Sequence, residues 1–73
     1  MKVKNYAVVI KELHFNDEES KQLNLVYWSD IRKYEVFYGG YKGVMWAKSV
    51  GFFEDLKDAI NQFYKIAKKF YKH

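Results

Sequence analysis

The chain has 73 residues, no cysteine or proline, a formal net charge of +4, and seven Tyr, six Phe and two Trp residues. It is the length of one small domain, spanning 1–73, and it has no thiols for a disulfide or a thiolate metal site. No stretch approaches the ~20 apolar residues that span a bilayer. The N-terminal residues 1–13 lack a long apolar run and a cleavage site, so we expect no signal peptide, no membrane partner and a cytoplasmic protein.

The first half of the chain predicts two strands. Residues 3–13, VKNYAVVIKEL, are rich in β-branched and aromatic side chains, and the acidic segment 16–20 forms a turn after them. Residues 23–28, LNLVYW, alternate in a second strand. One face of this strand carries Leu23, Leu25 and Tyr27, and the other carries Asn24, Val26 and Trp28. As an alternative, residues 17–24 begin with a short helical turn.

Two more strands are predicted before the C-terminal segment. After a turn at Ser29-Asp30, residues 33–38 alternate, with Tyr34, Val36 and Tyr38 opposite Glu35 and Phe37. Gly39-Gly40, with Gly43 close by, allows the positive backbone angles of a tight hairpin. Residues 44–50 then form a fourth strand, and Gly51 leads toward the last element.

The segment from Asp55 to His73 predicts an amphipathic helix. Asp55 is a candidate N-cap, acidic residues occupy the first turn, and lysines occupy the last. The apolar positions recur at i, i+3, i+4 and i+7, namely Leu56, Ala59, Ile60, Phe63, Ile66, Ala67 and Phe70. Because one helix cannot bury this stripe alone, it must pack on the strands. The expected fold is therefore α+β (ββββα), a four-stranded antiparallel meander with one C-terminal helix on one face.

The residues available for catalysis do not form a catalytic group. His14 and His73 are the histidines, and none of Ser20, Ser29 and Ser49 has a histidine at usable spacing. His14 lies near acidic residues but lacks a third spaced ligand for a metal. The glycines at 39, 40 and 43 do not form a strand-to-helix phosphate loop. We therefore expect a protein that is not an enzyme, with no cofactor, metal or small-molecule substrate.

A binding surface is the stronger expectation, because residues 21–48 interleave aromatic and cationic side chains. Single-stranded nucleic acid is bound by rings that stack on bases and by cations that meet phosphates. Trp28, Tyr41 and Trp46 are the expected stacking residues. The expected phosphate contacts are Lys21, Arg32, Lys33, Lys42 and Lys48. Since Arg32 is the one arginine, the lysines suit backbone attraction rather than reading of base edges.

Part of the chain resembles a known family. Residues 21–28, KQLNLVYW, followed by 33–36, KYEV, are similar to the strand-turn-strand core of bacterial relatives of the transcriptional coactivator positive cofactor four. The resemblance implies a four-stranded sheet with a helix, a homodimer, and single-stranded DNA bound across the sheet. It carries over Lys21, Trp28, Lys33 and Lys42 as site residues. The chain departs from the family pattern where Phe37 replaces an arginine and Gly39 replaces an aromatic residue.

A second segment is similar to another class of DNA-binding domain. Gly51 and Phe53, with Ala59, Phe63 and Ala67, resemble the strand-to-helix step of ethylene-response-type and integrase-arm domains. That class reads DNA with strand arginines, which this chain lacks.

The sequence therefore leads to one functional expectation and one alternative. The expectation is a non-catalytic, dimeric protein that binds nucleic acid, preferably single-stranded DNA, through an aromatic and lysine-bearing sheet face. The alternative is a protein-interaction or self-assembly module, in which the same aromatic residues form a dry interface.

Overall fold

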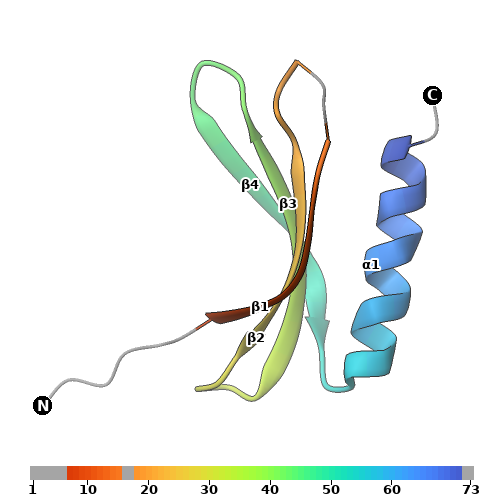
Figure 1. The fold of residues 1–73 in the computed structure, drawn as a ribbon. Helices are drawn as coiled ribbons and strands as arrows, with labels where there is room; N and C mark the ends of the chain where they lie inside the picture. Colours follow the sequence, from red (N-terminus) through yellow and green to blue (C-terminus); the bar gives the residue numbers. More distant parts are fainter. Residues whose placement is uncertain (1–6, 16–17, 72–73) are drawn as a thin grey trace, which may run out of the picture.

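The computed structural model describes residues 7–15 and 18–71, and it has the predicted ββββα order. The strands are β1 (Ala7–His14), β2 (Gln22–Trp28), β3 (Lys33–Tyr41) and β4 (Met45–Phe53), and the helix is α1 (Leu56–Tyr71). Figure 1 shows two layers, a twisted sheet and α1 alongside it. The described part contains no helix that is long and apolar enough to cross a membrane.

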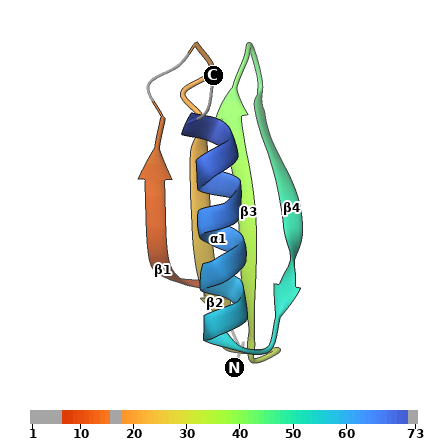
Figure 2. The same cartoon turned by 90° about the vertical axis from the view of Figure 1, so that its right-hand side faces the viewer.

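The sheet is an antiparallel meander in the order β1-β2-β3-β4. Its edges are β1 and β4. Figure 2, turned by 90°, shows α1 lying over the two central strands, with β1 and β4 to either side. No described element covers the opposite side of the sheet (Figure 1), which we call the open face.

The core lies between α1 and the central strands. Leu23, Leu25 and Val36 are fully buried from the sheet, and Phe63 is 1% exposed from the helix. Burial of each such side chain stabilises the fold by about 1.5–3 kcal/mol. The remaining buried members of the cluster are Phe15, Ala59, Ile66 and Ala67. The predicted helix stripe is thus confirmed, except that Leu56, at the start of the helix, is 38% exposed.

The ends of α1 follow their sequence signals. The carbonyl of Asp55 accepts the amide hydrogen of Ala59 at 3.1 Å, which makes it the first backbone bond of the helix. Asp58 lies in the first turn, and Lys68 and Lys69 lie in the last turn. These charges oppose the helix dipole and stabilise both ends.

Two strand irregularities decide which side chains reach the open face. The β1–β2 register shifts between Val9 and Lys11, and the β3–β4 register shifts so that Val36 pairs with Gly51 but Phe37 pairs with Ser49. Each shift inserts one residue and reverses the side-chain alternation along the rest of the strand. As a result, Phe52 pairs with Glu35 on the open face instead of following Trp46 and Lys48 onto the helix side.

The structure corrects the predicted hairpin position. Gly39 and Gly40 lie inside β3, which continues to Tyr41, and the turn falls at residues 42–44 instead. Gly43, with φ of 77°, supplies the positive backbone angle there. The prediction was wrong because two adjacent glycines also suit a strand whose neighbour approaches closely.

Other boundaries differ by a few residues. The described part of the first strand begins at Ala7, and residues 3–6 of the predicted strand lie outside the described residues. The alternative for 17–24 began with a short helical turn; residues 18–19 do form a turn, but no helix, and Gln22 to Asn24 are strand, while residue 17 lies outside the described part. The fourth strand runs to Phe53, beyond the predicted Val50. The last two residues of the predicted helix, 72–73, also lie outside the described part.

Candidate interaction surface

The open face carries large apolar side chains from all four strands. Their positions follow from the register and the alternation along each strand. The exposed fraction is 54% for Val9, 50% for Phe52, 56% for Tyr41 and 82% for Met45. Half-buried Trp28 and Phe37 lie among them. Aromatic residues and methionine are the types enriched at protein interfaces.

Val26 shows how densely one part of this face is packed. It is 3% exposed, yet it does not belong to the core cluster beneath α1. Its pairing with Val9 on β1 and Glu35 on β3 places it on the open face. Side chains of the open face itself therefore exclude water from Val26, and this part of the sheet has a small apolar layer of its own.

Trp28 is held in place by a hydrogen bond on the open face. Its indole Nε1–H donates to Oε1 of Glu35 at 2.9 Å, in a part-buried position. The bond satisfies the polar atom of the indole, and the ring then presents only carbon to its surroundings. Because the ring is oriented by a charged acceptor, it forms a rigid apolar platform.

We expect Trp28→Phe to lower the free energy of unfolding, because the smaller ring buries less apolar area. The loss should be about 1 kcal/mol larger than this area effect alone, since a charge-assisted hydrogen bond is also removed. Urea denaturation at fixed protein concentration measures this loss. Glu35→Gln is the matched control, because its amide oxygen still accepts the bond. A double-mutant cycle with Glu35→Ala separates the bond from the area, and strictly additive losses would contradict the coupling.

The ionisable groups on the open face do not give it positive charge. Among the described residues these groups are Glu12, His14, Lys33 and Glu35. The face therefore carries two carboxylates and one ammonium group. His14 lies 3.7 Å from Glu12, and Lys33 lies 3.4 Å from Glu54. The open face is therefore close to neutral, although the whole chain has a formal charge of +4.

Most lysines of the described part lie on the other side of the molecule. The register places Lys11, Lys21 and Lys48 on the side of the sheet that α1 covers. The helix adds four exposed lysines, namely Lys57, Lys65, Lys68 and Lys69. The positive charge that would attract a polyanion therefore lies on the helix side and not on the open face.

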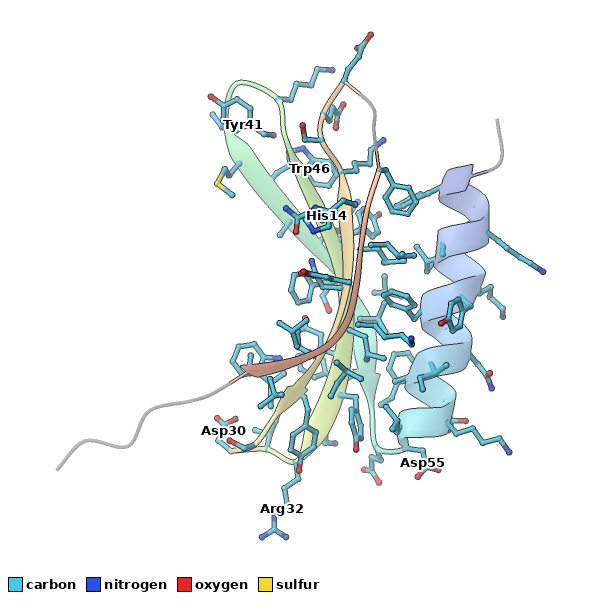
Figure 3. All side chains as sticks on the ribbon, in the orientation of Figure 1. His14, Asp30, Arg32, Tyr41, Trp46 and Asp55 are labelled. Atoms are coloured by element: carbon cyan, nitrogen blue, oxygen red, sulfur yellow. The ribbon has the colours of Figure 1, made fainter. Side chains whose placement is uncertain are left out.

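The eight residues expected to bind nucleic acid do not share one surface. Trp28, Lys33 and Tyr41 lie on the open face. Arg32 lies in the β2–β3 turn at one end of the molecule, and Tyr41 lies at the opposite end, as Figure 3 shows. The structure therefore separates the expected platform for bases from most of the expected phosphate contacts.

The remaining expected residues lie at or behind the β3–β4 hairpin. Trp46 packs edge-on against Tyr38 at 5.9 Å between ring centroids, on the helix side. Lys21 lies over the Phe70 ring at 5.7 Å, and Lys48 pairs with Tyr38 on the same side. Lys42, in the hairpin turn, lies 3.8 Å from a carboxylate oxygen of Glu19. Lys21, Trp46 and Lys48 thus form a separate helix-side group.

A hollow of about 250 Å³ lies in one half of the open face, near the β3–β4 hairpin. Gly39 and Ala47 face each other across the ladder, so the hollow lacks large side chains at that point. Phe37, Tyr41 and Met45 stand around it. The hollow is apolar and open to solvent, and it is large enough for one aromatic side chain.

Within the described ranges, 7–15 and 18–71, no group of three or more potential metal ligands occurs. Every buried side-chain nitrogen or oxygen of that part has a hydrogen-bond partner.

Sequence reasoning did not single out several residues of the open face. Phe52 was missed because the predicted fourth strand ended before it, and Gly39 because it was assigned to a turn. Val9, Val26 and Met45 look like ordinary strand residues in the sequence. The available signal was the excess of apolar side chains over what one helix covers.

Comparisons with known proteins do not assign this chain to a family. No protein-family model, no curated protein and no solved structure matches this chain significantly. The two resemblances noted from the sequence therefore stay hypotheses, and the functional argument depends on the chain's own geometry.

Proposed function

We propose that this protein is a self-associating interaction domain, in which the open face of the sheet packs against the open face of a second copy. One observation carries the proposal. The uncovered face is apolar, aromatic and nearly neutral, whereas most lysines of the described part lie on the helix side. This distribution suits a dry protein interface on the open face better than a polyanion site.

A second copy of the chain is the partner that the surface supports best. The area of the open face follows from its spacings. Neighbouring strands lie about 4.8 Å apart and same-face residues follow one another about every 6.8 Å along a strand, so the four strands give a face of roughly 500–600 Å² per copy. Two such faces bury about 1,000–1,200 Å², the area at which specific interfaces begin. A domain of this length has a small core and gains most from an additional buried layer.

The stacked arrangement would place two sheets about 10 Å apart, with the helices on the outside. Trp28, Phe37 and Phe52 would then be the central apolar contacts. Glu12 lies on the edge strand β1 and Lys33 lies in the last row of the open face, where a polar rim stays wet. Glu35 lies between Val26 and Phe52, where its carboxylate accepts the hydrogen bond from Trp28. The helix-side lysines would remain exposed on both outer surfaces.

The test is the mass in solution by light scattering after size exclusion, at about 100 µM protein, as expected for a weak interface of this size. We expect twice the 8.8-kDa mass of the chain. Phe37→Glu, in the middle of the open face, should give a monomer, because it would bring two buried carboxylates together. Circular dichroism shows whether the variant keeps its fold.

Tyr64→Glu is the matched control. Tyr64 is 47% exposed on the helix, so the same change there alters charge without touching the open face. This variant should remain a dimer. A monomeric wild-type chain, or a folded Phe37→Glu variant that still dimerises, would refute the proposal.

Nucleic acid is the competing outcome of a parallel experiment. A labelled single strand is titrated at about 50 mM and about 200 mM salt, since phosphate contacts weaken steeply with salt. The proposal expects no binding that competes with dimerisation. Salt-sensitive binding that dissociates the dimer would place nucleic acid on the open face and overturn self-association as the function of that face.

A further inference from the structure

The open face is divided into two unlike halves by its central row. The register aligns Glu12, Asn24, Phe37 and Ser49 across the four strands. On one side of this row lies the hollow beside the β3–β4 hairpin. On the other side lie the larger apolar side chains, which we call the ridge, consisting of Val9, Val26, Trp28 and Phe52.

The hollow exists because of one close approach of two strands. A Cβ atom on Gly39 would lie 2.4 Å from the backbone carbonyl oxygen of Trp46 and 3.2 Å from Cα of Ala47. No side chain fits there without movement of the backbone. Ala47, opposite Gly39, adds only a methyl group. The floor of the hollow is therefore backbone and one Cβ atom.

The ridge presents its most exposed aromatic side chain on β4, the strand that also carries Ala47 of the hollow. Phe52 is 50% exposed. It pairs with Glu35, in the row next to the central row on the ridge side. Ala47 pairs with Gly39, in the row next to the central row on the hollow side. Ser49 lies in the central row, between Ala47 and Phe52 along β4. Phe52 and Ala47 are therefore equally displaced from the central row in opposite directions.

We propose that the two copies are related by a two-fold axis that runs across the strands, along the central row. This inference rests on the proposed self-association and specifies its geometry. Such an axis lays β4 of one copy over β4 of the other in the opposite direction. Phe52 of each copy then enters the hollow above Ala47 of the other, and the contact occurs twice.

The arrangement matches a large side chain with space on both β2 and β4. Trp28 lies two rows from the centre, so it faces the end of the hollow near Ser20, not another Trp28. An axis parallel to the strands would instead bring each ridge against the other ridge and leave both hollows empty. Interfaces are packed as densely as protein interiors, so the first arrangement is favoured.

A charge-swap experiment tests the geometry. Ala47→Glu should place a carboxylate in the hollow against the ring of Phe52, and Phe52→Lys should place an ammonium group over an apolar floor. Each variant alone should dimerise at least tenfold more weakly than wild type. Mixed together, they should form a heterodimer, because one contact is then native and the other pairs opposite charges. Native mass spectrometry distinguishes the heterodimer from both homodimers by mass.

Lys48→Glu is the control for charge on the same strand. Lys48 neighbours Ala47 in sequence but lies on the helix side, so this variant should dimerise as wild type does. Circular dichroism of each variant shows that it keeps its fold.

The outcomes separate the inference from the proposed function. If wild type dimerises, each single variant weakens the dimer and mixing does not restore it, then the open face is the interface and the axis is wrong. If wild type is monomeric, the proposed function fails and the inference fails with it. Preferential formation of the heterodimer supports both.

Discussion

Replacing Phe63 with alanine should lower the free energy of unfolding by about 3–5 kcal/mol. Phe63 is 1% exposed and lies in the middle of the helix stripe, within the cluster that includes Leu23, Leu25 and Val36. Removing its ring costs both the transfer free energy and a cavity that neighbouring side chains cannot fill. A chain of this length has a free energy of unfolding of about 4–11 kcal/mol in total, so the loss is a large part of its stability.

Urea denaturation followed by circular dichroism measures this effect at fixed protein concentration. Phe63→Leu keeps most of the volume and should unfold at an intermediate urea concentration if the alanine variant does not fold. Lys65→Ala, at an exposed position on the same helix, is the control and should change stability by less than about 0.5 kcal/mol. A loss below 1.5 kcal/mol for Phe63→Ala would mean that the helix is not packed as described.

Gly39→Ala should destabilise the protein by about 1–3 kcal/mol, as overpacking does, even though alanine normally suits a strand better than glycine. The added Cβ atom would lie 2.4 Å from the carbonyl oxygen of Trp46, which belongs to the paired strand. That oxygen is backbone, so it moves only if the β3–β4 ladder moves with it. The same methyl group would also partly fill the hollow.

The comparison with Ser49→Ala isolates the clash. Ser49 is exposed on the same face, and its substitution removes a hydroxyl group without adding volume. We expect Ser49→Ala to unfold at nearly the wild-type urea concentration and Gly39→Ala to unfold at a clearly lower one. An increase in stability for Gly39→Ala would show that the two strands are further apart than the structure has them.

The structure changes the balance between the two functional readings of the sequence. Composition alone made aromatic and cationic residues look like parts of one surface, because they alternate between Trp28 and Lys48. The folded chain separates them into an apolar open face and a basic helix side. This separation is the reason why we propose self-association through the open face. The helix-side group of Lys21, Trp46 and Lys48 is where we expect any salt-sensitive binding of a single strand.

The sequence by itself determined the fold class and the core. The helix stripe through Phe63 and the alternation of Leu23 and Leu25 in the second strand have periods of 3.6 and 2, and each predicts a single buried face. These patterns are local, so they were sufficient to predict the order ββββα and the two faces of the second strand, but not which of these faces α1 covers.

Only the tertiary structure decided which residues share the open face. The extra residue in β4, near Val50, reverses the alternation, so Phe52 lies opposite to the side that counting from Trp46 would give. Likewise, the sequence around Gly39 is compatible with a turn and with a strand. The close approach of β4 to Gly39, which only the structure shows, decides for the strand. Register and bulges depend on how separate strands pair, and no pattern within one strand contains that information.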